Sequence, residues 1–375
     1  MKSLRATATA SSLALLVIVG AYLFLIIRLQ RAAATSAWIT GDWLINYSDG
    51  FVRRGAIGEI CRRLYLMASI DPVTAIVALK AFCYASLCAA LLILVIRRTI
   101  GAVELALFIS PAALPFEIYD PLGSGRKEII LLAVFASYVL ADLLAPDMDR
   151  PYWKRWRFWF LLFALPILTL VHEGLFFFFP FFLAYEALQR GVRREEGLMF
   201  GVPLSAAAIV FVASAIYRGD SGISAAMCSS LRSMSLDPQL CGGAIAALEH
   251  YDVSVDGWDL LRFLMLGGLT FGPLLWYATQ VLDSTRHAGT PLAIGLAMGS
   301  TLPLYVLSED WGRWMHIATM LILVIIIACK DASIHLPRKH PVFAVATFVA
   351  ACVYVIAWQL PHWIHSPLPL LRAAL

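Results

Sequence analysis

Long apolar runs, separated by shorter charged stretches, dominate the chain from end to end. Windows of about nineteen residues place membrane-crossing segments at 11–29, 73–96, 101–117, 127–145, 157–171, 174–189, 198–216, 260–282, 290–307, 314–329 and 341–360. Because a helix crosses a bilayer in about 20 apolar residues, we predict an all-α, polytopic transmembrane helical bundle of about eleven spans. We expect residues 1–375 to form a single transmembrane domain.

Two of the predicted spans contain proline. The segment 101–117 holds Pro111 and Pro115, and the segment 157–171 holds Pro166. Proline removes a backbone donor and disturbs the preceding turn, which a membrane protein tolerates where the backbone does not face lipid. We therefore expect these spans to be bent or unwound near their ends.

Composition and charge refine this class. Of the 375 residues, 61% are hydrophobic and 14% are charged, which excludes an ordinary soluble domain. Lysine and arginine gather in alternate loops, at 97–98, 150–157, 190–194, 286 and 330–339, and at residues 2–5. The positive-inside rule assigns these to the cytoplasm. We expect a multi-pass protein of the cytoplasmic (inner) membrane whose N-terminus is cytoplasmic, on a retained signal anchor, and whose C-terminus is extracytoplasmic.

The opposite loops collect nearly every mixed cluster of acids, bases and aromatic residues, at 30–72, 117–128, 172–173, 217–259 and 308–314. Within the first outer loop, 30–72, apolar residues at helical spacing over 56–69 predict an interfacial helix on the outer leaflet or a helix packed on neighbouring loops. The long outer loop, 217–259, contains Cys228 and Cys241. In an oxidising compartment these would form a disulfide, and two free thiols are the alternative.

The first outer loop also carries the main candidate chemistry. Asp42 and Asp49 offer carboxylates for proton transfer, and Arg53 and Arg54 offer guanidinium groups for an anion, among aromatic residues that suit a sugar ring. The alternative is a charged linker with internal ion pairs.

A glycine-rich turn, Gly123-Ser-Gly125, precedes Arg126 and Lys127 at the start of a predicted span. Amide donors at a helix N-terminus, reinforced by two cations, suit a phosphate group. The spacing is not that of a nucleotide-binding loop, and a loop that ends in a capped helix is the competing interpretation.

Two further clusters complete the outward set. His172 beside Glu173 forms a tight turn between spans, where the imidazole either binds or protonates an oxyanion or belongs to a structural His–Glu pair. The other cluster comprises Glu309, Asp310, Trp311, Arg313 and Trp314. Its residue types resemble those of a carbohydrate-binding subsite. An interfacial tryptophan belt and an ordinary helical ion pair would give the same sequence pattern and are the alternatives.

The sequence contains no pattern that indicates another class of functional site. Cysteine and histidine show no metal-ligand spacing and the basic loops show no nucleic-acid pattern, so we predict no metal, no cofactor and no nucleic-acid partner. Lys80 and Asp142 lie near the ends of apolar spans, where we expect their charged groups to reach toward water.

Taken together, the acids of the first outer loop, its predicted interfacial helix and the outward arginines and histidine resemble integral-membrane glycosyltransferases of the GT-C class and the related Wzy-type polysaccharide polymerases and O-antigen ligases. The resemblance implies cell-envelope polysaccharide biosynthesis from a glycan linked to polyprenyl phosphate or diphosphate. It also implies an outer-loop carboxylate as the base and membrane lipid as a partner.

We therefore expect a membrane glycosyltransferase or polysaccharide polymerase with Asp49 as the base and Asp42 in reserve. The leaving phosphate would be neutralised by the outward cations, assisted by His172; these are Arg53, Arg54, Arg126, Lys127 and Arg313. Glu309, Asp310, Trp311 and Trp314 would line the acceptor site. A transporter or flippase of a polar or lipid-linked solute and a membrane acyltransferase with His172 as the base are the alternatives.

Overall fold

The computed structural model describes residues 2–98, 100–146, 151–190, 194–248, 254–282, 290–330, 349–350 and 352–364. Within these ranges every regular element is helical, as the apolar patterning predicts. The longer helices are α1 (Lys2–Ala32), α4 (Pro72–Arg98), α8 (Glu128–Leu144), α9 (Trp156–Val171), α11 (Arg194–Ile216), α13 (Gly257–Val281) and α16 (Trp311–Cys329).

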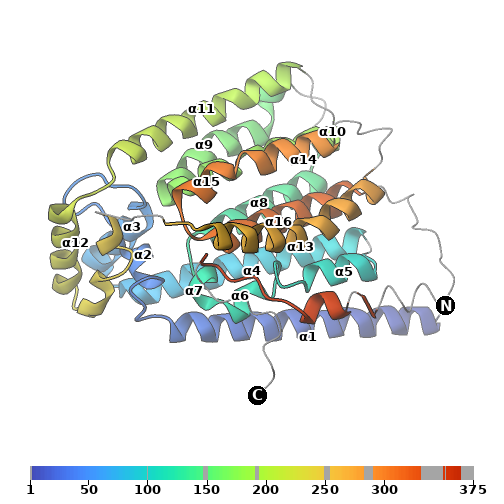
Figure 1. Ribbon diagram of the computed structural model, residues 1–375, viewed down its shortest axis with the longest axis horizontal. Coiled ribbons are helices and arrows are strands. Elements are labelled where there is room, and N and C mark those ends of the chain that lie inside the picture. The colour runs from blue at the N-terminus through green and yellow to red at the C-terminus, as the bar shows by residue number, and fades with distance from the viewer. Residues whose placement is uncertain are drawn as a thin grey trace.

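Shorter elements connect these helices. They are α2 (Thr40–Leu44), α3 (Ala56–Ala68), α5 (Ala102–Phe108), α6 (Phe116–Tyr119), α7 (Pro121–Ser124), α10 (Pro180–Arg190), α12 (Ser221–Ser233), α14 (Thr290–Gly299) and α15 (Leu302–Leu307), with 3-10 turns η1 (Tyr152–Lys154), η2 (Glu173–Phe178), η3 (Pro238–Cys241) and η4 (Ala246–Leu248). Figure 1 shows α1 along one edge of the bundle, α11 along the opposite edge, and α12 beyond one end of the helices.

Four described segments are long and apolar enough to cross a membrane, namely Pro72–Arg98, Gly197–Ile216, Gly257–Val281 and Trp311–Cys329. Several shorter apolar helices accompany them. Helix α16 differs from the others because every residue from Trp311 to Ala328 is buried. A helix that is apolar all round belongs inside a bundle, and α16 packs against α4, α8, α10 and α13.

The first proline-containing span is unwound near its end, as predicted, whereas the second is not unwound, and a bend there stays a prediction. Helix α5 ends at Phe108, and the chain runs without helix through Pro111 to Pro115. Helix α9 instead continues through Pro166 to Val171, so that helix is not interrupted. The predicted span 290–307 divides into α14 and α15, where the Ser300 hydroxyl donates to the carbonyl of Phe177 at 2.7 Å. Of the predicted span 341–360, residues 341–348 and 351 lie outside the described residues.

The helix predicted at 56–69 is α3. Ile57 and Cys61 are buried against the bundle, whereas Leu66 and Met67 near its end are exposed. Glu59 pairs with Arg62 at 2.8 Å and with the more exposed Arg63 at 2.7 Å. This amphipathic arrangement suits a leaflet surface, and its position there stays a prediction.

The expectation that Lys80 and Asp142 reach toward water is wrong. Lys80 is 1% exposed; its ammonium donates to Gln30 at 3.1 Å and lies 5.2 Å from the ring centre of Trp43. Asp142 is buried and forms ion pairs with Arg157 and Arg190. Packing against other helices therefore satisfies these groups instead of solvent.

The described part of the loop predicted at 217–259 folds onto the segment around α2. Cys228 of α12 and Cys241 of η3 are joined by a disulfide whose Cα atoms lie 5.5 Å apart. The carbonyl of Leu240 lies so close to Gly41 that a Cβ there would approach it to 2.8 Å. The disulfide-linked segment therefore packs directly against the short helix α2.

Candidate functional site

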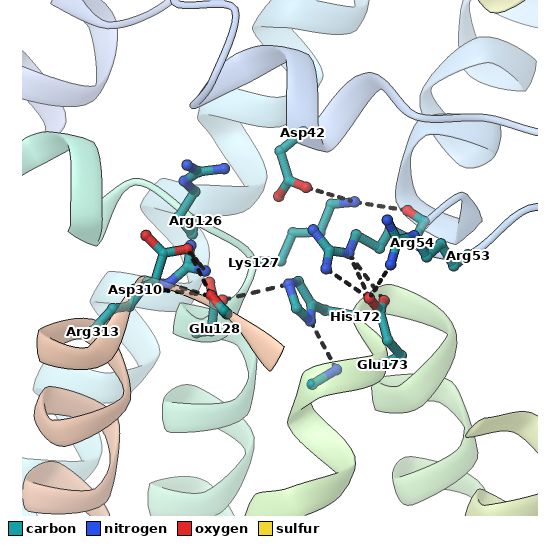
Figure 2. Close-up of polar contacts among 12 residues, drawn as sticks. Asp42, Arg53, Arg54, Arg126, Lys127, Glu128, His172, Glu173, Asp310 and Arg313 are labelled. Atoms are coloured by element: carbon teal, nitrogen blue, oxygen red, sulfur yellow. Dashed lines mark hydrogen bonds and ion pairs between the residues drawn. The ribbon is translucent and has the colours of Figure 1, made fainter. Parts of the chain in front are cut away.

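Five segments that are distant in sequence bring their charged side chains together within the bundle. Figure 2 shows this group, which we call the polar cluster; it comprises Asp42, Arg53, Arg54, Arg126, Lys127, Glu128, His172, Glu173, Asp310 and Arg313. The segments are α2, the turn before α3, the start of α8, the junction of α9 with η2, and the start of α16. Most of the residues proposed from sequence therefore meet at one place.

Backbone contacts explain how the first loop reaches the cluster. The indole of Trp43 donates to the carbonyl of Gly125 at 2.9 Å, which ties α2 to the turn before Lys127. Arg54 has φ +65°, and the following Gly55 lies against Tyr47, whose ring a Cβ at position 55 would approach to 2.2 Å. This left-handed turn and its glycine direct Arg54 toward Glu173.

Arg54 and Glu173 form the most closely connected pair. The Arg54 Nε lies 3.0 Å from each Glu173 oxygen and its Nη2 lies 2.6 Å from Oε1. Burial alone would raise the pKa of Glu173, but Arg54 and His172 hold it well below its usual range. Burial and the neighbouring Arg54 lower the pKa of Arg53 to about 10. Much of Arg54's donor capacity is thus committed to Glu173.

Asp42 and Lys127 face one another at a longer distance. Lys127 Nζ lies 3.9 Å from Asp42 Oδ1 and donates to the carbonyl of Arg54 at 2.7 Å. Neither carboxylate oxygen of Asp42 has a hydrogen bond, although the residue is 1% exposed. Burial would raise the pKa of Asp42, but Lys127 and Arg126 lower it to about 2. Burial lowers the pKa of Lys127 to about 8 against the opposing effect of Asp42.

Glu128 is the second buried carboxylate without a hydrogen bond. Arg313 Nε lies 3.6 Å from its Oε1, and His172 Nε2 lies 3.7 Å from the same oxygen. Arg313 donates instead to Asp310 at 2.7 Å, and its guanidinium lies 4.5 Å from the ring centre of Trp314. Figure 2 shows Glu128 between the side chains of Arg313 and His172.

The protonation of His172 follows from its contacts. The backbone N–H of Gly174 donates to His172 Nδ1 at 3.0 Å, so that nitrogen is an acceptor. Burial, and then Arg54, hold the pKa of His172 well below its usual range, so the ring is neutral near pH 7. A neutral imidazole that accepts at Nδ1 carries its proton on Nε2. His172 therefore presents an N–H donor toward Glu128.

Arg126 has no ion pair with a described acid. Its Nε donates to the carbonyl of Leu122 at 3.3 Å, and its guanidinium lies 5.9 Å from the ring centre of the half-exposed Trp38. Figure 2 places its side chain beside Asp310 and Arg313. Arg126 thus keeps guanidinium donors that no described carboxylate takes.

Other proposed residues lie outside the cluster. Asp49 is exposed in a turn and forms no ion pair with the described residues. Glu309 accepts from the backbone of Ser254 at 2.9 Å and from the indole of Trp363 at 3.0 Å. Trp311 packs in a separate apolar cluster with its ring 5.3 Å from that of Phe263, whereas Trp314 lies 6.2 Å from the His172 ring.

Glu128 had no role in the sequence interpretation, and neither did the buried pair of Glu117 and His316. His316 Nε2 lies 3.0 Å from Glu117 Oε1, and its Nδ1 lies 3.0 Å from the carbonyl of Ala112. The available signal was an ionisable residue inside or beside an apolar run, which usually faces the interior of a bundle. In the part of the chain that is described, no group of three or more His, Cys, Asp or Glu residues is arranged to hold a metal ion.

Comparison with known proteins adds the family. No curated protein and no solved structure matches the chain. The family model described as uncharacterised membrane protein Rv1490 matches residues 10–252, more than half of the chain. That range includes the cluster residues from Asp42 to Glu173, while Asp310 and Arg313 lie beyond it. The chain therefore belongs to the family of uncharacterised membrane protein Rv1490.

Proposed function

We propose that this protein is a membrane glycosyltransferase or polysaccharide polymerase that uses a lipid-phosphate-linked sugar donor at the outer face of the cytoplasmic membrane. One observation carries the proposal: the polar cluster combines buried carboxylates that lack hydrogen bonds with several cationic side chains. A transferase of this kind has to hold a phosphate, accept a proton from a hydroxyl group and keep bulk water away.

The cationic side chains of the cluster are suited to binding the phosphate group of the sugar donor. Arg126 has no acidic partner among the described residues, and Lys127 lies at the start of α8 beside it. Guanidinium groups bind phosphate oxygens in a fixed geometry, while an ammonium group acts as a point charge. Both groups would stabilise the charge that develops on the leaving phosphate.

The acidic side supplies the proton acceptor. Sequence reasoning preferred Asp49 and kept Asp42 in reserve. Asp42 belongs to the cluster and Asp49 is exposed in a turn, so the geometry favours a buried carboxylate of the cluster over Asp49. Because a phosphate leaving group is already a stable anion, the reaction does not require a metal ion to assist its departure.

The outward orientation of the cluster is part of the proposal, and two features support it. Cys228 and Cys241 form a disulfide in the segment that packs against α2, and disulfides persist in oxidising compartments. Helix α8 starts in the cluster at Glu128 and carries Asp142 about four turns later, roughly 20 Å away. There Asp142 pairs with Arg157 and Arg190, beside the loops predicted to be cytoplasmic.

The decisive experiment uses the purified full chain in lipid nanodiscs. Polyprenyl-phosphate and polyprenyl-diphosphate donors carrying a radiolabelled sugar are incubated with water-soluble glycoside acceptors, and transfer is counted. Wild-type protein is expected to transfer sugar, Arg126→Ala to lose at least about 100-fold, and the exposed Arg232→Ala to remain active. Absence of transfer by wild type with all donors, together with solute accumulation in sealed vesicles, would refute the transferase assignment.

A transporter remains the second candidate because of Lys80. A lysine buried within an apolar span, without an ion pair to a described acid, is the kind of group that marks substrate or ion pathways. An acyltransferase is less consistent with the structure. It would need an imidazole nitrogen ready to accept a proton, whereas His172 accepts at Nδ1 from Gly174 and carries its proton on Nε2.

A further inference from the structure

The cluster contains several carboxylates, and their contacts separate them. Glu173 accepts two-pronged hydrogen bonds from Arg54, and Asp310 accepts from Arg313 at 2.7 Å. A carboxylate that is fully engaged by a guanidinium group is a poor proton acceptor, because protonation would break the ion pair. These two acids are therefore structural partners of arginines.

Asp42 differs from them but is also held ionised. Its oxygens lack hydrogen bonds, yet Lys127, Arg126 and Arg54 surround it and keep its pKa near 2 despite burial. Brønsted behaviour makes such a weak base inefficient at accepting a proton near pH 7. Asp42 instead provides the negative charge that keeps Lys127 in place next to the phosphate side.

Glu128 remains, and its surroundings suit proton transfer. Two side-chain donors face it, Arg313 Nε at 3.6 Å and His172 Nε2 at 3.7 Å, and both lie beyond hydrogen-bond distance. A buried carboxylate without hydrogen bonds carries a desolvation cost. A hydroxyl group held between these donors would supply the missing hydrogen bond and would place its proton on a Glu128 oxygen.

His172 contributes position instead of proton transfer. Its Nδ1 is occupied by the Gly174 N–H, so the imidazole offers one fixed Nε2–H donor on the side of Glu128. A neutral donor of this kind can hydrogen-bond the acceptor oxygen while that oxygen loses its own proton. Arg313, anchored by Asp310 and by the face of Trp314, fixes the opposite side.

We propose that Glu128, to which the sequence pattern assigned no role, is the carboxylate that accepts the proton of the acceptor hydroxyl, and that His172 and Arg313 position it. The proposal rests on the glycosyl-transfer function above. As the acceptor oxygen bonds to the anomeric carbon, its proton passes to Glu128. The bond from that carbon to the phosphate oxygen breaks, and its electron pair leaves with the lipid phosphate beside Arg126 and Lys127. Glu128 afterwards releases the proton to water.

The test compares two acceptor chemistries in nanodiscs. A glycoside with a free hydroxyl group needs a base, whereas its analogue with a thiol at the same position is largely a thiolate at pH 9 and needs none. Glu128→Gln is expected to lose at least about 100-fold in kcat with the hydroxyl acceptor. With the thiol acceptor it is expected to stay within about 5-fold of wild type, because only the proton-transfer step has been removed.

Two further variants complete the test, one a conservative replacement and the other a control. Glu128→Asp, which retains the carboxylate one methylene further back, is expected to recover about 10-fold over Glu128→Gln with the hydroxyl acceptor. Asp237→Asn, an exposed acid in the loop that carries the disulfide, serves as the matched control. Intact Cys228–Cys241 pairing and unchanged binding of polyprenyl phosphate report that each variant is folded.

The outcomes separate the two proposals. If wild type transfers sugar and Glu128→Gln does so equally well with the hydroxyl acceptor, the role of Glu128 is refuted and the transferase function stands. If Glu128→Gln loses transfer activity equally with both acceptors while still binding polyprenyl phosphate, Glu128 is structural and the inference is again overturned. If wild type transfers nothing from any donor, the proposed function fails and this inference fails with it.

Discussion

The ammonium group of Lys127 and the carboxylate of Asp42 lie 3.9 Å apart with neither side chain exposed. Burial outweighs the attraction of Asp42 for the lysine, so the pKa of Lys127 falls from 10.5 to about 8. For the carboxylate the surrounding cations outweigh burial, and its pKa falls from 3.8 to about 2. The two groups are therefore both charged at neutral pH, but Lys127 approaches its titration range.

The first prediction concerns pH and the phosphate. If Lys127 binds the leaving phosphate, binding of polyprenyl phosphate to the purified protein should weaken as pH rises through about 8, where the ammonium loses its proton. Lys127→Arg should keep its charge and flatten that dependence up to pH 10. Affinity measured between pH 6 and 10 checks this. An equal decline in both proteins would assign the effect to another group.

The same group makes a prediction about stability. The folded-state pKa of Lys127 lies below its unfolded value, so between about pH 8 and 10.5 the unfolded chain binds more protons at this site. The contribution of Lys127 to the free energy of unfolding should therefore rise with pH across that window. Chemical unfolding of wild type and Lys127→Met at pH 7 and pH 10 measures it. The difference between the two proteins should change in favour of wild type at pH 10.

The Arg54–Glu173 pair is predicted to hold the first loop to the helical bundle. Replacing Glu173 by Gln leaves a largely buried guanidinium group without its carboxylate and should cost about 2 kcal/mol, which is less than a fully buried pair because Arg54 is 25% exposed. Combining Arg54→Met with Glu173→Met should recover part of that loss. Thermal unfolding in detergent, analysed as a double-mutant cycle, provides the coupling. Additive losses would show that the two residues act independently.

The disulfide is predicted to stabilise the segment that covers α2. Cys228 and Cys241 are separated by 13 residues, and closing a loop of that size contributes about 3 kcal/mol. Replacing both cysteines by serine should lower the thermal midpoint, and a reductant should lower it only in wild type. An identical response of the double variant to the reductant would place the effect elsewhere.

Orientation gives the last prediction. A cysteine introduced at the exposed position Asp237 should react with a membrane-impermeant maleimide in intact cells, because the cluster end is proposed to face outward. A cysteine at the exposed position Lys154 should react only after the membrane is opened. The reverse pattern would invert the proposed topology and contradict an outer-face reaction.

The sequence predicts the helical class and many helix positions well because apolar runs of membrane length have few other solutions. Helix α4 begins at Pro72 and ends at Arg98, next to the predicted limits 73 and 96. The division of 290–307 had a sequence signal that the prediction did not use, since Pro303 stands in the first turn of α15. About eleven membrane crossings stay a prediction.

The site was predictable in outline and not in its details. Spacing indicates which loops carry charge, so Asp42, Arg54 and His172 were found from sequence. The pairing of Arg54 with Glu173 could not be predicted, because the two residues are 119 positions apart in the sequence. The sequence interpretation ranked Asp49 ahead of Asp42, but tertiary packing buries Asp42 and leaves Asp49 exposed. Glu128 was overlooked because an acid in the first turn of a helix is ordinary helix chemistry.

The burial of α16 on every side also bears on how the protein is made. This helix is among the last parts of the described chain to leave the ribosome, yet its final neighbours include α4 and α8, which are synthesised much earlier. Helices α4 and α8 also contact one another, so this pair can form before α16 is made, and α16 then packs against both. Because Asp310 precedes α16 and Arg313 lies in its first turn, the polar cluster is complete only once this helix has packed into the bundle.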